Sequence, residues 1–326
     1  MNLLNKFMVM VSQSIWMTLP LVGICVADSY PARPVRWIAP FPPGSSIDVT
    51  GRVFAPKFTE LLGQNFLVDN RPGAAGNVGA EIVAHAPADG YTLLGATTPL
   101  AASAALFAKL SFDPRRDFVP ISMLTSTSYL LVVRPSLGIV NLKDMIARAK
   151  ADPSKFTYAS VGIGSTAHLL MESIKSQTGI NLVHVPYKGS SFVMPDLIGG
   201  QVDYFFASTQ ALVPQVKAGR LRALGITALK RNIHLPEIPT IAESGVPRFE
   251  ATNWVMLLAP AKTPKSVINT LNKAIFQLSQ SADVNEQINA LGASVVVNKP
   301  DQAALILQEE IKRWSKVVLA ANIKPE

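Results

Sequence analysis

The feature that most constrains the fold of this chain is a repeated order of apolar strand, glycine- or serine-rich loop and amphipathic helix. The first apolar segment, VRWIAP at 35–40, is followed by the loop 41–46 and a helical pattern over 48–62. The segment NFLVDN, the loop RPGAAGNVG and a helical pattern over 80–86 repeat this order, and a third strand pattern, YTLLGATT, follows. The order is typical of a parallel sheet whose faces are covered by helices.

The same order begins again near the middle of the chain. Strand patterns YLLVVRPS, FTYASV, LVHVPY, VDYFFAS and LRALGIT alternate with helical patterns over 142–151 and 167–178 and a short helix in SSFVMPDLIGG. The last part differs, because the strand pattern ATNWVMLLAP is followed by two long helical segments. We therefore predict an α/β protein with two lobes and a ligand cleft between them. The first lobe is expected over 28–127 plus 228–326, and the second over 128–227.

Composition excludes extended disorder and does not favour nucleic acid as a partner. Of the 326 residues, 48% are hydrophobic and 16% are charged, so the chain can bury a large core. The formal charge is +8 and the isoelectric point is about 9.6. The basic residues are scattered, with only isolated pairs such as Arg115 with Arg116, whereas polyanion-binding proteins usually present a basic stripe or patch.

The first 27 residues predict export. Lys6 is their only charge, and the following apolar or neutral stretch ends in Ile24-Cys25-Val26-Ala27. This arrangement predicts a signal peptide over 1–27, cleaved after Ala27, and a periplasmic mature protein. A lipoprotein signal is the first alternative, but bulky Ile24 precedes the cysteine. The second is an uncleaved anchor of about 20 residues, which polar residues and a proline interrupt.

Cysteine use excludes some kinds of site. Cys25 is the only cysteine, so no internal disulfide and no cysteine-based metal site is expected. Cleavage after Ala27 would leave the mature chain without cysteine. No metal is predicted, because the four histidines show no spacing typical of a metal site.

Several strand-to-helix loops are candidate anion sites. Gly162-Ile163-Gly164-Ser165-Thr166 combines backbone N–H groups, two hydroxyls and the positive end of a helix. PFPPGSSID, RPGAAGNVG, Lys188-Gly189-Ser190-Ser191 and Ser208-Thr209 are similar. Each is also explained as a plain helix cap. The glycine spacing in RPGAAGNVG is not that of a dinucleotide loop, and no nucleotide-hydrolysing loop occurs.

An enzymatic interpretation has little support in the sequence. Ser165 and His168 are three residues apart, but no acidic residue nearby would orient the histidine. The motifs G-x-S-x-G and H-E-x-x-H do not occur. A secreted Ser/His enzyme therefore stays only an alternative.

Ten ordered motifs carry a family resemblance from about Tyr30 to Lys324: PFPPGSSID, VDNRPGAAGNVGAE, DGYTLL, YASVGIGSTAHL, VPYKGSS, DLIGGQVD, KAGRLRALGIT, LPEIPTIAESG, NWVMLLAPAKTP and a C-terminal W-x-x-V. The chain resembles the Bug (TctC-like) family of periplasmic receptors of tripartite tricarboxylate transporters. The resemblance implies a two-lobe periplasmic-binding-protein-like fold of type II, without catalysis or cofactor. It also implies a monomer that closes on a small carboxylic acid and delivers it to membrane permease subunits.

The resemblance also implies a set of ligand contacts. They are Phe41, Gly44, Ser45, Ser46, Asp48, Gly73, Ala74, Thr97, Gly162, Ser165, Thr166, Lys188 and Ser208. This chain departs from the family pattern at Ser45, where many members have glycine, and at Ala207 and Ser208, where many have Asp-Asn. The lost carboxylate favours plain di- or tricarboxylic or aromatic acids over an amino acid. A sensory co-receptor, which presents its ligand to a membrane signalling protein, would have the same sequence features.

Closure is expected to hinge where the chain crosses between the lobes, near 125–128 and 225–228. Backbone N–H groups and hydroxyls would hold the carboxylate without a buried arginine.

Overall fold

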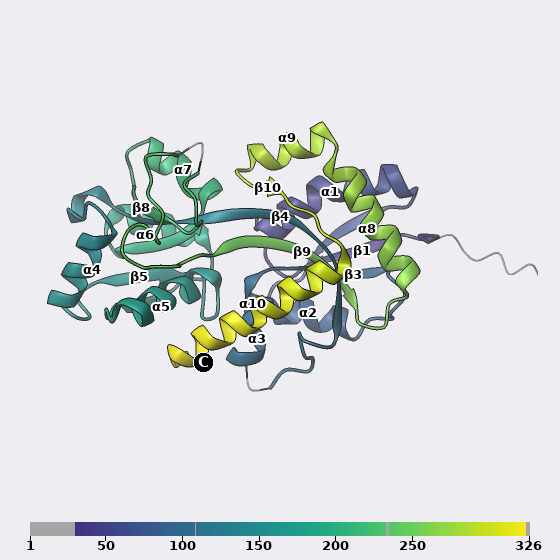
Figure 1. Ribbon diagram of the computed structural model, residues 1–326, viewed down its shortest axis with the longest axis horizontal. Helices are drawn as coiled ribbons and strands as arrows, with labels where there is room; N and C mark the ends of the chain where they lie inside the picture. The colour runs from purple at the N-terminus through teal and green to yellow at the C-terminus, as the bar shows by residue number, and fades with distance from the viewer. Residues whose placement is uncertain (1–29, 108, 233–234, 324–326) are drawn as a thin grey trace, which may run out of the picture.

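A computed structural model describes residues 30–107, 109–232 and 235–323, and Figure 1 shows two lobes joined by long strands. The predicted leader over 1–27 lies outside the described residues. Across the described ranges, no helix combines the length and apolar character needed to cross a bilayer.

The first lobe is built on a mixed sheet. Its strands β1 (Val35–Ala39), β2 (Phe66–Asn70) and β3 (Thr92–Ala96) are parallel, in the order β2-β1-β3. β9 (Thr252–Pro260) lies antiparallel between β3 and the long strand β4 (Phe118–Val133). Around this sheet lie α1 (Ser46–Leu62), the turn η1 (Ala74–Gly76), α2 (Asn77–Ala84), α3 (Thr98–Leu106), α8 (Lys265–Ser279), α9 (Ala282–Ala290) and β10 (Ser294–Val295).

The alternation of side chains along β1 shows why the sheet is covered on both faces. Trp37 and Ile38 are both fully buried, but they belong to two different apolar cores. Since neighbouring residues of a strand point to opposite faces, each face needs its own layer of helices.

The second lobe repeats the arrangement. β5 (Thr157–Ser160), β6 (Val183–Pro186) and β7 (Tyr204–Ser208) are parallel in the order β7-β5-β6, while β7 and β8 (Arg222–Ile226) lie antiparallel to the end of β4. The helices are the turn η2 (Pro135–Leu137), α4 (Leu142–Ala151), α5 (Thr166–Thr178), α6 (Ser190–Gly199) and α7 (Thr209–Lys217). Two α/β lobes are therefore present, as the sequence predicts.

The chain crosses between the lobes in β4 and β9. In β4 the partner strand changes between two residues, since Ser128 pairs with Thr252 of β9 and Tyr129 pairs with Ser208 of β7. After β8 the chain stays with the second lobe, because Ala251 N donates to Thr227 O at 3.0 Å. From this bond we propose that the second crossing lies in β9, in place of 225–228, and that the second lobe extends through Ala251.

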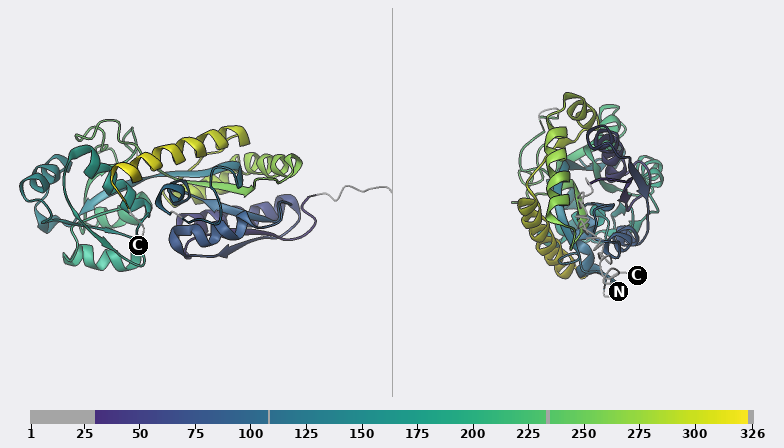
Figure 2. Two further views of the ribbon diagram at one scale, coloured as in Figure 1. Left: turned by 90° about the horizontal axis from the view of Figure 1, so that it is seen from below. Right: turned by 90° about the vertical axis from the view of Figure 1, so that its right-hand side faces the viewer.

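The C-terminal helix α10 (Pro300–Ala320) lies along both lobes. It packs against α3 and β4 and, toward its end, against α5, and Figures 1 and 2 show its course beside the crossing strands. Trp254 of β9 and Trp314 of α10 both donate their indole N–H to Glu310 Oε2, at 2.8 and 2.9 Å. This shared acceptor fixes α10 onto the crossing strand. Its long helical pattern is predicted from the sequence, whereas α9 is not.

Candidate functional site

Three helices of the two lobes are the next elements after parallel strands. α1 follows β1, α3 follows β3 and α5 follows β5, with Ser45, Thr97 and Ser165 as the N-cap residues. The positive ends of these helices therefore lie at the carboxyl edges of the two sheets, where α/β proteins bind ligands.

The loop before α2 has an unusual backbone. Gly73, Ala74, Ala75 and Gly76 all have positive φ, of 143°, 46°, 53° and 94°. For the two alanines this conformation costs about 1–3 kcal/mol each. The loop packs closely on Phe41, since a Cβ at Gly76 would lie 3.1 Å from the Phe41 ring. Phe41, Gly73 and Ala74, predicted as ligand contacts, therefore belong to one surface of the first lobe.

The two lobes approach each other at Gly164. A Cβ at this glycine would lie 2.7 Å from Leu106 Cδ1 of α3 and 3.9 Å from Ala75 Cβ. The predicted anion loop of the second lobe thus faces the strained loop of the first lobe. At Gly162, by contrast, a Cβ would have no neighbour within 4 Å, so open space lies in front of it.

Three buried polar side chains at these helix starts lack a hydrogen-bond partner among the described residues. They are Asn77 through Nδ2 at the start of α2, Thr98 through Oγ1 at the start of α3, and Ser165 through Oγ at the N-cap of α5. Their exposed fractions are 7%, 0% and 7%. A buried polar group without a partner costs about 1–3 kcal/mol. All three can donate a hydrogen bond, and each lies at the positive end of a helix, which is an environment that favours an anion.

Hydrogen bonds to the carboxylate of Asp48 hold the loop between β1 and α1 in place. It is 2% exposed, and its carboxylate accepts hydrogen bonds from Gly44 N at 2.9 Å, Asn70 Nδ2 at 3.0 Å and Arg52 Nε at 3.1 Å. Burial raises the pKa of Asp48, but the bonds from Arg52, Gly44 and Asn70 outweigh it and lower this pKa overall. Gly44 and Asp48, predicted as ligand contacts, thus bind each other. Ser45 accepts weakly from Asp48 N at 3.4 Å.

The loop of Gly162 to Thr166 rests on two stacked histidines. The rings of His168 and His184 are 4.1 Å apart and nearly parallel. Gly164 N donates to His168 Nδ1 at 3.1 Å, and Ser160 Oγ lies 2.7 Å from His184 Nε2 and also binds Gly162. Burial lowers the pKa of His168 to about 3 and that of His184 to about 4. Both rings are therefore neutral near pH 7.

This arrangement argues against Ser165 as a nucleophile. His168 Nδ1 is used by the Gly164 amide, while Ser165 Oγ has no partner in the described part of the chain. Nucleophilic catalysis needs a base within hydrogen-bond reach of the hydroxyl, so the Ser/His enzyme alternative loses its geometric basis.

The crossing strands form the inner end of the site. Thr97 Oγ1 donates to Asn253 Oδ1 of β9 at 3.3 Å, and Ser46 lines a small cavity together with Asn253 and Thr127 of β4. Ser208 ends β7 beside Tyr129, and Thr166 is hydrogen-bonded to Tyr129. Ser46, Thr97, Thr166 and Ser208 therefore gather beside β4 and β9.

Lys188 lies apart from these residues. It is exposed in the loop after β6, and β6 is the edge strand of the second lobe. No contact in the described residues joins Lys188 to the helix starts, so its role as a ligand contact stays a prediction.

Sequence reasoning missed Asn77 and Thr98. Asn77 is the first residue of α2 and follows the glycine-rich loop, and Thr98 is the first residue of α3 and follows Thr97. The family resemblance points to that loop and to Thr97, but not to these two residues. A polar residue at a helix start usually indicates a cap, and only the packed structure shows that neither side chain acts as one.

A family model describes the chain over residues 50–323, as "Tripartite tricarboxylate transporter family receptor". Among curated proteins, BugT of Bordetella pertussis is 40% identical over 300 residues, which cover 91% of this chain and 92% of BugT.

Solved structures of similar proteins share the fold. Rpa4515 of R. palustris with adipate has a TM-score of 0.83 at 34% identity, covering 91% of this chain and 100% of that chain. The periplasmic binding protein BugD has a TM-score of 0.81 at 30% identity, with the same two coverages. MatC from Rhodopseudomonas palustris with bound malate has a TM-score of 0.79 at 32% identity, covering 89% of this chain and 100% of that chain. The fold is thus that of periplasmic binding proteins.

Proposed function

We propose, from the premise that this chain belongs to the tripartite tricarboxylate transporter receptor family, that it binds a small dicarboxylate outside the cytoplasm and delivers it to a membrane permease. The family is one of solute-binding receptors and not of enzymes. The dicarboxylate class is supported by the adipate and malate that two structural relatives hold. We propose tricarboxylic and aromatic acids as further candidate ligands of the same site.

The observation that carries this function is the set of unsatisfied donors at Asn77, Thr98 and Ser165. Hydrogen bonds to a charged group contribute about 1.5–3 kcal/mol each. Three of them, with the helix ends and less the cost of ordering, are sufficient for a Kd near about 1 μM. Neutral donors suit a carboxylate, because they hold it without titrating near pH 7.

The residues at the end of β7, Ala207 and Ser208, favour an acid that has no ammonium group. Neither offers a carboxylate to a cation at the end of β7. We therefore expect dicarboxylates to bind more tightly than acidic amino acids of equal length.

The proposed export has its own test. We expect the mature protein to begin at Asp28 and to be recovered from the periplasm. Mass spectrometry of the exported protein measures the N-terminus, and an intact leader would support the anchored alternative.

Binding is tested by thermal shift and calorimetry with adipate, malate, citrate, benzoate and glutamate. A dicarboxylate at about 100 times its Kd stabilises the folded protein by about 2.7 kcal/mol. Ser165→Ala and Thr98→Val are each expected to weaken binding about tenfold or more. Because each removes an unsatisfied buried group, neither is expected to lower the melting temperature of the unliganded protein.

Thr270→Val, on the outer surface of α8, is the control for both variants. The proposal fails if no acid raises the melting temperature, or if the variants lose stability without losing affinity.

A further inference from the structure

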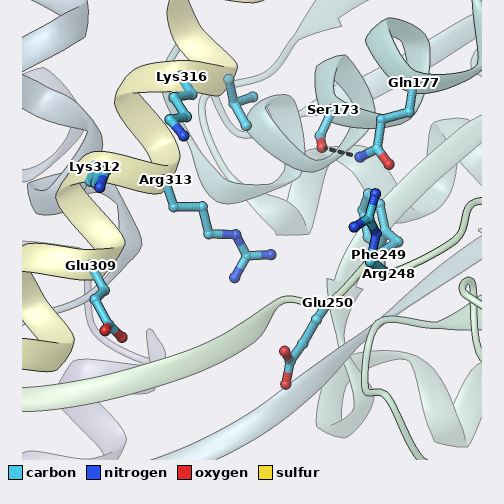
Figure 3. Close-up of a pocket in the computed structure, with 10 residues that line it drawn as sticks. Ser173, Gln177, Arg248, Phe249, Glu250, Glu309, Lys312, Arg313 and Lys316 are labelled. Carbon is cyan, nitrogen blue, oxygen red and sulfur yellow. Dashed lines mark hydrogen bonds between the residues drawn. The ribbon is translucent and has the colours of Figure 1, made fainter.

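A second cavity of about 460 Å³ lies between α5, the segment before β9, and α10. Figure 3 shows the side chains that line it. None of them belongs to the helix starts of the cleft. The cavity is large enough for a small molecule.

Cationic side chains from two separate parts of the chain converge on this cavity. Arg313 and Lys316 of α10 and Arg248 of the segment before β9 all line it. Figure 3 shows Arg313 extending from α10 toward the side on which Arg248 lies, with Lys316 above it and Glu250 and Glu309 lower in the view. Lys312 adds a fourth positive charge to the lining. Four cations against two carboxylates leave an excess of positive charge.

The charges of Arg248 and Lys316 are not neutralised by the protein. Among the described residues, neither forms an ion pair. Arg313 forms one long ion pair, with Glu310 at 3.4 Å, and its guanidinium also lies 5.2 Å from the centroid of the Trp314 ring. Arginine presents a planar fork that matches the oxygens of a carboxylate or phosphate, and lysine adds a compact charge.

The backbone at Arg248 is a second, independent observation. Its φ is +60°, a left-handed conformation that disfavours residues with a Cβ. Val246 and Phe249 are almost fully buried, and Phe249 N donates to Val246 O at 3.2 Å. The buried side chains of Val246 and Phe249 thus hold the turn in place. Residue 248 has a backbone conformation that glycine adopts more readily, but it is an arginine, and it lines the cavity.

We propose that this cavity binds a small oxyanion with two or more negative charges, held by Arg248, Arg313 and Lys316. Either a phosphate compound or a polycarboxylate could provide this oxyanion, because both have negatively charged oxygens that can accept hydrogen bonds from the two guanidinium groups. The site is separate from the solute cleft and does not depend on the function proposed for it.

The test is calorimetry on the mature protein with inorganic pyrophosphate, and separately with citrate, each in the presence and absence of adipate. We expect saturable binding that adipate does not abolish. The paired substitution Arg248→Gly with Lys316→Ala is expected to weaken binding at least about tenfold. Its melting temperature is expected to be unchanged or raised, because glycine accepts the positive φ of residue 248.

The control pair is Lys150→Ala with Arg220→Ala, which removes the same charge from exposed positions outside the cavity. In the presence of saturating adipate, binding of pyrophosphate but not citrate identifies a phosphate compound, and binding of citrate but not pyrophosphate identifies a polycarboxylate. The proposal is overturned if neither anion binds saturably, if adipate competes fully, or if both pairs of substitutions weaken binding equally.

Discussion

Ser165, Thr98 and Asn77 are polar groups that folding buries without a protein partner. Each such group costs about 1–3 kcal/mol, a substantial part of a total stability of about 5–15 kcal/mol. The positive φ of Ala74 and Ala75 adds further cost at the same cleft. Under the proposed function, a ligand that supplies acceptor oxygens to these groups would recover part of this free energy.

Asp48 gives a first prediction at this scale. Asp48→Asn replaces a carboxylate oxygen by an NH₂ group facing the donors of Gly44, Arg52 and Asn70. We expect the free energy of unfolding near about pH 7 to fall by about 1–3 kcal/mol, measured by urea denaturation. The pKa of Asp48 is lowered in the folded state, so its contribution is complete above the ordinary pKa of 3.8 and is lost as the pH falls through the folded value.

The difference between Asp48→Asn and the wild type should therefore shrink in acid. Exposed Asp152→Asn is the control, because its pair with Lys155 lies in solvent and contributes little. A difference that stays constant down to about pH 3 would contradict the proposed role of the carboxylate.

His168 gives a second prediction. Its folded-state pKa of about 3 lies below the ordinary 6.5, so the unfolded chain takes up the proton first as the pH falls. Stability is then complete above about pH 6.5 and is lost progressively toward the folded pKa, by up to about 1.4 kcal/mol per pH unit. His168→Asn, which keeps an acceptor for Gly164 N, should make this loss shallower. Melting temperatures across this pH range measure the slope, and an unchanged slope would assign the acid sensitivity to other groups.

At the scale of elements, α5 connects the cleft to the rest of the second lobe. Ser165 is its N-cap residue, and Thr166 and the buried His168 lie in its first turn. The loop before α5 contacts α3 of the first lobe through Gly164. We therefore propose that closing of the lobes depends on the space at Gly164.

Gly164→Ala tests this dependence. The glycine has a φ of +77°, and a Cβ would lie 2.7 Å from Leu106 Cδ1. Gly179, at the other end of α5, has a φ of +71° with no neighbour within 4 Å of a Cβ, so Gly179→Ala carries the same backbone strain without the contact. We expect a similar loss of stability, about 1 kcal/mol, in both variants, but weakened dicarboxylate binding only in Gly164→Ala. Equal affinities would show that the lobes do not need to approach there.

Glu310 tests the attachment of α10. Glu310→Ala leaves the indole N–H groups of Trp254 and Trp314 without their acceptor, and we expect a loss of about 2–5 kcal/mol in unfolding free energy. Glu310→Gln keeps one acceptor oxygen and should cost less than half as much. Exposed Glu309→Ala is the control, measured by the same denaturation. A small effect of Glu310→Ala would mean that apolar packing alone holds the helix.

Much of this architecture can be predicted from periodicity, and the exceptions have physical reasons. The helix over 142–151 and the start of α5 agree with the sequence pattern to within a residue. The second crossing that we propose, in β9, could not be predicted from periodicity, because the segment between β8 and β9 has no helix or strand in its described residues and is attached to Ile226 and Thr227 by long-range backbone bonds. Ser165 is predicted from its loop, whereas Asn77 and Thr98 become candidates only once burial and missing partners are known.

At the scale of the whole molecule, two paired strands, β4 and β9, connect lobes that meet at Gly164. A closed cleft is favoured by a ligand that binds both lobes. We expect small-angle scattering of the unliganded protein to give a larger radius of gyration than this structure, and a saturating dicarboxylate to bring the two into agreement. Identical scattering with and without the bound acid would exclude closure as the response.

The position of β9 between β3 and β4 has a consequence for the order of folding. The second lobe, as proposed, is one continuous stretch of chain, so its contacts form as soon as that stretch is available. The sheet of the first lobe stays divided until Thr252–Pro260 arrives, and α10 is added later still. The earliest part of the chain to be synthesised is therefore the last to reach its native state, and β1, β2 and β3 need protection from aggregation during that interval.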